Sequence, residues 1–418
     1  MTLEETIIGL ARETKGAARQ VANLSTTVKN RVLLAMAAAL LERKDYIQAQ
    51  NELDLAAGRE KGLSAAMLDR LALSDKVIEA MVTGLREVAA LPDPVGEISE
   101  LQRRPSGIMV GRMRIPLGVI GMIYESRPNV TVDAAALCLK AGNAVVLRGG
   151  SEALHSNLAL AQVLRDCLAA EQLDPAAIQV IPVTDREAVT CMLRLEEQID
   201  LIIPRGGEGL IRFVSENSRI PVLKHYKGVC HVFVDAGADL GMAGDIVING
   251  KTQRPGVCNA LETLLVHRDA AAEFLPAVGA RLALAGVEIR GCPQTLALMP
   301  MAVPAGPDDW GMEFLDLILA VKVVADIDEA LTHIARYGSQ HTEAIITNNH
   351  AHAQRFLREV DSSSVMVNAS TRFSDGGQYG LGAEIGISTT KLHAYGPMGL
   401  RELTTRKFIV YGEGQIRV

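Results

Sequence analysis

The sequence predicts an α/β protein made of two doubly wound domains and a small β-ribbon. From residue 117 on, short apolar runs of strand length alternate with segments of helical periodicity, which is the pattern of a parallel sheet covered by helices. The alternation resumes after residue 229 for long enough to form a second domain. A basic, alternating stretch at residues 108–116 follows a Pro-Ser-Gly turn and predicts the ribbon.

Size and composition exclude several classes of protein. The chain has 418 residues, 48% of them hydrophobic and 22% charged, which favours two packed domains of ordinary size. A net charge of -7 argues against a nucleic-acid binder. No apolar run reaches the roughly 20 residues of a membrane span, and the first residues lack the pattern of a signal peptide. We therefore expect a cytoplasmic protein with no membrane partner.

The elements can be placed in order along the chain. Residues 1–94 have helical spacing, with an apolar stripe from Val32 to Leu41 and a helix cap at Ser64. The first sheet is expected to contain strands at 118–124, 144–147, 178–183 and 199–203, and helices at 132–141, 152–169, 186–195 and 208–216. The second domain is expected to contain strands at 229–234, 262–267, 315–324, 342–347 and 364–368, and helices at 240–251, 269–284, 327–337 and 350–360. A glycine-rich loop at 374–386 precedes a last strand at 406–411.

Cys258 is the most informative single residue. It lies between an expected helix, 240–251, and an expected strand, 262–267. Pro255 and Gly256 break the helix, so the thiol is held on a tight connection with rigid flanks. A buried structural cysteine would more naturally lie inside an apolar run. The position is typical of a nucleophile presented to a substrate.

The other five cysteines have ordinary interpretations. Cys138, Cys167 and Cys191 fall in helical patterns, Cys230 in a strand, and Cys292 in a loop. The chain has no CxxC and no His/Cys cluster in its sequence, so we expect free thiols and no metal site.

Two glycine turns follow strands of the first domain, open helices and carry an arginine. They are Arg148-Gly149-Gly150-Ser151 and Arg205-Gly206-Gly207. Backbone N–H groups at a helix N-terminus suit phosphate, and arginine adds charge-assisted bonds. One such turn is commonly plain topology, but two on one sheet favour an anionic ligand. Because no GxGxxG follows the first strand, a nucleotide would be held differently from a standard dinucleotide site.

Three further features have both ordinary and functional interpretations. Asn129 follows Pro128 and could cap a helix. Glu313 could be a loop acid on the surface. The basic run 224–227 could be a solvated cluster, but it lies at the expected domain junction, where ligand sites tend to form.

Taken in this order, these residues resemble the aldehyde dehydrogenase superfamily over nearly the whole chain. The long matching segments are residues 124–131, 147–153, 223–231, 258–267, 315–324 and 372–386. Within the superfamily they are similar to the branch that reduces L-glutamyl 5-phosphate to L-glutamate 5-semialdehyde in proline biosynthesis. The resemblance implies an aldehyde dehydrogenase-like fold and reduction by NADP(H) through a cysteine thioester.

The resemblance also implies a role for each matching position. Cys258 would be the nucleophile, and Asn129 would form the oxyanion hole with the backbone N–H of Cys258. Glu313 would hold the nicotinamide ribose. The other implied cofactor contacts are Arg148, Gly149, Ser151, Arg205, Gly206 and Gly207. The candidates for binding the anionic groups of the substrate are Arg127, Lys224, His225, Arg254 and Arg372.

One departure from the superfamily narrows the expected chemistry. Hydrolytic members carry a glutamate that activates the deacylating water, and Lys224 or His225 occupies that place here. Positive charge there favours phosphate as the leaving or attacking group. A hydrolytic or acyl-CoA-dependent aldehyde dehydrogenase and a non-catalytic nucleotide-binding paralogue are the alternatives.

The resemblance implies a domain division as well. Residues 1–99 and 118–228 would bind the cofactor, with part of 369–400 returning to that domain, and residues 229–368 would carry the nucleophile. Residues 100–117 and 401–418 would form a ribbon that joins subunits into a homo-oligomer. Glutamate 5-kinase, the enzyme of the preceding step, is the implied functional partner.

Overall fold

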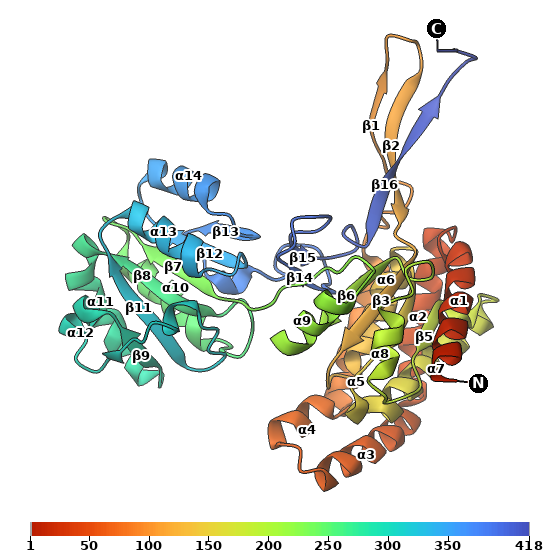
Figure 1. Cartoon of the computed structure of the whole chain (residues 1–418), viewed down its shortest axis with the longest axis horizontal. Helices are drawn as coiled ribbons and strands as arrows, with labels where there is room; N and C mark the ends of the chain where they lie inside the picture. Colours follow the sequence, from red (N-terminus) through yellow and green to blue (C-terminus); the bar gives the residue numbers. More distant parts are fainter. Residues whose placement is uncertain (1, 418) are drawn as a thin grey trace. The chain divides into compact units, whose positions relative to one another are not determined.

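The computed structural model describes residues 2–417 and divides into two compact units. Unit 1 contains residues 2–224, 381–386 and 398–417, and unit 2 contains residues 225–380 and 387–397 (Figure 1). Two of the points where the chain changes units fall inside β14 (Gly386–Ser388) and β15 (Gly396–Met398), which form a two-stranded sheet. No helix within residues 2–417 is both long enough and apolar enough to cross a membrane.

Unit 1 begins with five helices. A capping box starts the first one: the Thr2 hydroxyl accepts from the backbone N–H of Glu5, whose carboxylate accepts from the backbone N–H of Thr2. The predicted apolar stripe is buried in the second helix from Val32 to Leu40, whereas Leu41 is exposed. Ser64 caps the fourth helix, as expected. The helices are α1 (Leu3–Val21), α2 (Thr26–Glu42), α3 (Lys44–Glu60), α4 (Ala65–Leu71) and α5 (Asp75–Ala90).

A four-stranded parallel sheet forms the centre of unit 1. Its strand order is β5-β4-β3-β6, so β3, the first of these four strands in the sequence, is an inner strand. Nearly every strand residue is buried, because helices cover both faces. The strands are β3 (Val119–Tyr124), β4 (Ala144–Arg148), β5 (Ile178–Val180) and β6 (Leu201–Arg205). The helices that follow them are α6 (Asn129–Lys140), α7 (Leu154–Ala170), α8 (Glu187–Met192) and α9 (Glu208–Asn217).

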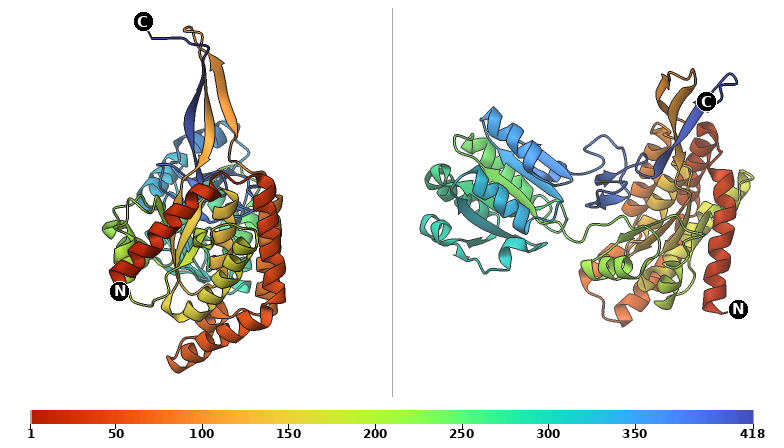
Figure 2. Two further views of the ribbon diagram at one scale, coloured as in Figure 1. Left: turned by 90° about the vertical axis from the view of Figure 1, so that its right-hand side faces the viewer. Right: turned by 45° about the horizontal axis from the view of Figure 1, so that its top comes forward.

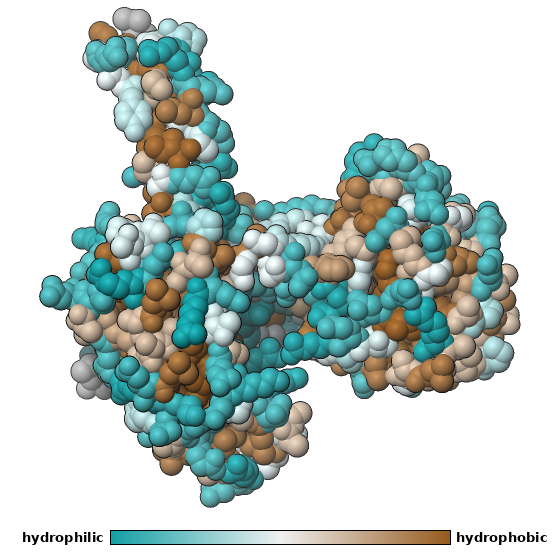
Figure 3. All heavy atoms as spheres, turned by 180° about the vertical axis from the view of Figure 1, so that it is seen from behind, coloured by the Kyte–Doolittle hydropathy of each residue, from teal (hydrophilic) through white to brown (hydrophobic). Residues whose placement is uncertain are grey.

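The predicted ribbon is an antiparallel sheet in the order β1-β2-β16. It contains β1 (Ile98–Arg103), β2 (Met109–Pro116) and β16 (Thr404–Tyr411), and the turn after β1 contains Gly107 at a φ of 90°. The views in Figures 1 and 2 agree that it extends away from the helices of unit 1. Apolar atoms are visible along it in Figure 3. The strand β16 exposes Phe408, Val410 and Tyr411, each more than half accessible.

Unit 2 is built on a seven-stranded parallel sheet in the order β10-β9-β11-β8-β7-β12-β13. Every neighbouring pair is parallel. The strands are β7 (Cys230–Val234), β8 (Leu261–His267), β9 (Glu288–Gly291), β10 (Val303–Pro304), β11 (Ile318–Val324), β12 (Thr342–Ile346) and β13 (Ser364–Val367). The helices are α10 (Leu240–Thr252), α11 (Arg268–Leu284), α12 (Pro293–Leu298), α13 (Ile327–Tyr337) and α14 (His350–Glu359). Apolar clusters cover both faces.

Cys292 lies in the loop between β9 and α12, as the sequence predicts. The side chain of Cys292 is buried there. Its sulfur accepts from the backbone N–H of Val323 at 3.4 Å. The expected strand at 315–324 begins later, at Ile318, because Leu315 has a φ of 55°, which a strand does not accommodate.

Candidate active site

In unit 1, the predicted residues follow the carboxyl ends of neighbouring strands. Asn129 is the first residue of α6, after β3; Arg148 ends β4; and Arg205 ends β6. Because β4, β3 and β6 are adjacent, their ends lie along one edge of the sheet, where ligands of doubly wound folds bind.

In unit 2, the predicted residues precede the amino ends of the strands of its own sheet. His225 precedes β7, Cys258 precedes β8, and Glu313 precedes β11. The order β11-β8-β7-β12 makes these strands direct neighbours, so residues distant in sequence come together. The same order brings in His341, which directly precedes β12 and was not among the residues predicted from the sequence.

The loop that carries Cys258 is fixed by its neighbours. A Cβ added to Gly228 would lie 1.9 Å from the carbonyl oxygen of Cys258, so only glycine fits there. The buried thiol of Cys230 donates to the same oxygen at 3.2 Å. Burial raises the pKa of Cys230 well above its ordinary value, which keeps this second cysteine a neutral donor. Cys258, by contrast, is half-buried on the connection between α10 and β8, as predicted.

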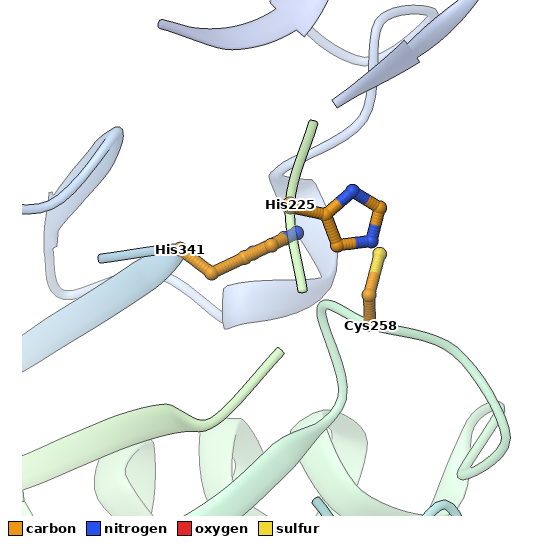
Figure 4. A group of neighbouring side chains, drawn as sticks. All are labelled: His225, Cys258 and His341. Carbon is orange, nitrogen blue, oxygen red and sulfur yellow. The ribbon is translucent and has the colours of Figure 1, made fainter. Parts of the chain in front are cut away.

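Two imidazoles accompany the sulfur of Cys258. One nitrogen of His225, one nitrogen of His341 and the sulfur all lie within 4.8 Å of one another. Figure 4 shows the ring of His225 beside the sulfur and the ring of His341 pointing toward that of His225. The two ring centroids are 5.6 Å apart in an edge-to-face arrangement. The structure therefore places two histidines beside the predicted nucleophile.

Hydrogen bonds settle the tautomer of His225. Its Nδ1 lies 3.0 Å from the carbonyl oxygen of Ile387, which can only accept, so Nδ1 carries the hydrogen. In the neutral ring Nε2 is then left with a lone pair, and Figure 4 shows that nitrogen next to the sulfur. For Lys224, the other residue that could align with the glutamate of hydrolytic relatives, the structure shows a hydrogen bond to the Ser215 hydroxyl in unit 1.

Two arginines flank the same loop. Arg254 is exposed on it, and Arg372 lies in the short turn Thr371–Phe373, where its Nε donates to the side chain of Gln253 at 2.8 Å. Burial lowers the pKa of Arg372, and the positive charge of Arg254 lowers it further. Two cations within electrostatic reach of each other favour an anionic ligand between them.

A buried ion pair joins the two elements that flank the Cys258 loop. Lys251, at the end of α10, and Glu262, in β8, are 2.6 Å apart and fully inaccessible. Glu262 also accepts from the backbone N–H of Leu315, near Glu313. Burial raises the pKa of Glu262 to about 7, an effect that Lys251 opposes and Glu313 reinforces. The pair thus ties α10 and β8, which flank the loop of Cys258, to the segment before β11.

We expect Lys251→Met to destabilise unit 2 by about 3 kcal/mol at pH 8, because it leaves a buried carboxylate without its partner. The loss should shrink at pH 6. Without Lys251 the folded-state pKa of Glu262 rises further above its unfolded value, so the carboxyl favours folding below the unfolded pKa and opposes it as the pH rises. Urea unfolding at the two pH values measures both effects. The double variant with Glu262→Leu should recover most of the loss, and a single variant as stable as wild type at pH 8 would contradict this role.

Asn129 does not cap its helix. The N-cap of α6 is Pro128, and the side-chain amide of Asn129 instead donates to a carboxylate oxygen of Asp133 at 3.0 Å. Burial raises the pKa of Asp133 to about 6, while the bond from Asn129 lowers it. An amide has two N–H groups, so the bond to Asp133 orients the side chain and leaves a second donor for a ligand.

The two glycine turns differ in which of their hydrogen-bond donors already have partners. Arg148 is buried, donates to the carbonyl oxygens of Gly149 and Thr184, and retains a buried Nε with no partner within the described residues. A Cβ at Gly149 would lie 2.1 Å from Asn157, so this glycine is needed for packing. Ser151 is exposed at the start of the short turn before α7.

The second turn opens α9. Gly207 is the N-cap, and nothing lies within 4 Å of a Cβ placed there. Its backbone N–H donates to the carboxylate of Glu125 at 3.1 Å, whereas a Cβ at Gly206 would strike that side chain. A carboxylate therefore occupies the position where a helix N-terminus binds an anion. Glu125 has no recognisable role in the sequence, because only the pairing of β3 with β6 brings it to this helix.

The fold is that of an aldehyde dehydrogenase. The sequence matches the family "Aldehyde dehydrogenase family" over residues 4–289, which is more than half of the chain, and the chain belongs to this family. The aldehyde dehydrogenase-like fold predicted from the sequence is confirmed. Enzymes of this family use NAD(P) as their cofactor.

Full-length relatives make the comparison more specific. The chain is 64% identical to the γ-glutamyl phosphate reductase of Desulfotalea psychrophila and 62% identical to that of Desulfatibacillum aliphaticivorans, in each case over 100% of both chains. A crystal structure of γ-glutamyl phosphate reductase from Thermotoga maritima matches with a TM-score of 0.97 at 48% identity, covering 99% of this chain and 100% of that one. The resemblance that the motifs predicted is therefore confirmed.

Proposed function

We propose that this enzyme reduces L-glutamyl 5-phosphate to L-glutamate 5-semialdehyde and phosphate with NADPH, as the second step of proline biosynthesis from glutamate. The observation that carries the proposal is the half-buried thiol of Cys258 with His225 beside it and two arginines around its loop. The names of the full-length relatives support the same substrate.

In the proposed reaction, Nε2 of His225 accepts the proton of the Cys258 thiol, and the thiolate attacks the acyl carbon. The bond from carbon to the phosphate oxygen breaks, phosphate leaves with its electron pair, and a thioester remains on Cys258. Arg254 and Arg372 would stabilise the leaving phosphate or the α-carboxylate, together with Arg127 and Lys224.

The residues of unit 1 fit a phosphate-bearing cofactor. The N-terminus of α9 has open space at Gly207 and a backbone N–H now bound to Glu125, and Arg148 has a buried Nε with no described partner. We propose that Arg148, Gly149, Ser151, Arg205, Gly206 and Gly207 hold NADP(H) and that Glu313 contacts its nicotinamide ribose. When bound, NADPH would supply the hydride that reduces the thioester.

Asn129 and the backbone N–H of Cys258 would stabilise the negative oxygen of the acyl group both when phosphate leaves and when the reduced carbon releases the sulfur. Protonated His225 can return its proton to the departing sulfur, which restores the thiol. Because we expect Lys224 or His225 at the place where hydrolytic relatives carry their water-activating glutamate, the proposal makes phosphate the exchange partner of the thioester.

The ribbon suits the proposed homo-oligomer. The strand β16 is at an edge of its sheet and exposes Phe408 at 63% and Val410 at 58%. An unpaired edge with exposed apolar side chains is a surface for pairing with another chain.

The reverse reaction tests the proposal. Purified enzyme given L-glutamate 5-semialdehyde and NADP⁺ should reduce the nucleotide only when phosphate or arsenate is present, with a rate at least about 10-fold lower without either, because the proposal makes phosphate, and not water, the acceptor of the acyl group. Sulfate at the same ionic strength is the control. Equal rates with and without phosphate would favour a hydrolytic aldehyde dehydrogenase instead.

A further inference from the structure

We propose that Cys258, His225 and His341 form an inhibitory binding site for Zn²⁺, in which the cation coordinates the nucleophile. The sulfur and one nitrogen of each ring lie within 4.8 Å of one another (Figure 4). One thiolate and two imidazoles are the donors that Zn²⁺ prefers, and ligand atoms around a tetrahedral zinc are about 3.3–3.7 Å apart, given bonds of about 2.0–2.3 Å. The half-buried His225 and Cys258 can close the remaining distance by small side-chain rotations.

A buried nitrogen of His341 with no described hydrogen-bond partner also points to a ligand. His341 is fully buried, and its Nε2 has no hydrogen-bond partner within the described residues. Such a group costs free energy unless something satisfies it. Its Nδ1 lies 2.9 Å from the Thr342 hydroxyl, so Nε2 is the nitrogen left to bind an ion, and Figure 4 shows the ring pointing toward His225.

The hydrogen bonds around the two rings match those of metal ligands. A histidine that binds a metal through one nitrogen normally donates through the other to a carbonyl or a similar acceptor, which fixes the ring and its tautomer. His225 does this through Nδ1 to the carbonyl of Ile387, at 3.0 Å. At His341, Nδ1 lies 2.9 Å from the Thr342 hydroxyl, which would accept the ring hydrogen when Nε2 binds a metal. These two hydrogen bonds position both rings before any ion binds.

Three protein ligands would leave the fourth position of a tetrahedral zinc for water. Binding converts the Cys258 thiol to a bound thiolate and releases one proton, which makes the affinity rise with pH. A coordinated sulfur cannot attack a carbonyl, and zinc would therefore inhibit by competing with the acyl substrate. The inhibition rests on the proposed function of Cys258, whereas the binding of zinc does not.

Direct binding tests the site without an activity assay. We would titrate the full-length enzyme with Zn²⁺ against a chromophoric chelator, and with Co²⁺ to observe the absorption of a sulfur–cobalt bond. Wild type should bind one ion per chain. Cys258→Ala and His225→Asn should each lower the affinity roughly 100-fold, since the loss of even an outer-shell partner costs 10–100-fold. The sulfur–cobalt absorption should disappear in Cys258→Ala.

Cys191→Ser is the matched control. This half-buried thiol is in α8 of unit 1, whereas both histidines belong to unit 2. It should bind zinc as wild type does. Equal zinc affinity in wild type and Cys258→Ala, or loss of binding in Cys191→Ser, would overturn the proposal. Far-UV circular dichroism verifies the fold of each variant. A failure of zinc binding leaves the phosphate-dependent reaction untouched, so the two proposals fail separately.

Discussion

Cys258→Ala should abolish turnover, with a loss of at least about 10⁴-fold in kcat, while the affinity for NADPH stays within about 2-fold of wild type. Removing a nucleophile eliminates the covalent path, and the remaining donors cannot replace it. Apart from Glu313, the proposed cofactor residues belong to unit 1, whereas Cys258 belongs to unit 2. Binding of the nucleotide should therefore survive the substitution. Fluorescence titration with NADPH and the phosphate-dependent assay measure the two quantities.

The matched control is again Cys191→Ser, which changes a thiol of similar exposure outside the loop. It should keep wild-type turnover. If Cys258→Ala oxidised the semialdehyde at more than a small fraction of the wild-type rate, the thioester mechanism would be wrong. If it lost NADPH binding as well, Cys258 would have a structural role in its loop besides the catalytic one.

Local sequence was sufficient to place Cys258 but not its neighbours. Pro255 and Gly256 end a helix before an apolar strand, and this pattern is complete within about fifteen residues. His341 is 83 residues further along the chain, at the start of a strand that lies beside β7 only because of the order β8-β7-β12. Nothing near His341 in the sequence distinguishes it from a structural histidine. Strand order, which pattern analysis does not supply, decides which residues meet.

Short elements and contacts between residues distant in sequence were also missed. The strand β9 has four residues and β10 has two, too few for an alternating pattern to be recognised, so neither strand was predicted. Gly228 is another example: its need for glycine comes from the backbone of Cys258, thirty residues away. By contrast, α13 was predicted at its observed bounds, 327–337, because an amphipathic helix with a clear start signal is encoded locally.

Asn129→Ala should lower kcat/KM by about 10²–10³-fold, or roughly 2.7–4 kcal/mol, which is the usual cost of losing one oxyanion donor. The variant should still bind NADPH and form the fold. Asn217→Ala is a suitable control, because this exposed amide at the end of α9 bonds only to the carbonyl of Phe213 among the described contacts. It should leave kcat/KM unchanged.

A structural effect of Asn129→Ala can be separated from a catalytic one by pH. Asn129 lowers the pKa of Asp133, which burial raises to about 6, so its removal raises that pKa further. A carboxyl whose folded-state pKa is raised favours folding below its unfolded pKa and loses that contribution as the pH rises through the folded value. The variant should therefore lose thermal stability relative to wild type mainly above pH 6. A catalytic defect of the same size at pH 6 and pH 8 would support the oxyanion role, whereas a defect that follows the loss of stability, or a kcat/KM within 3-fold of wild type, would contradict it.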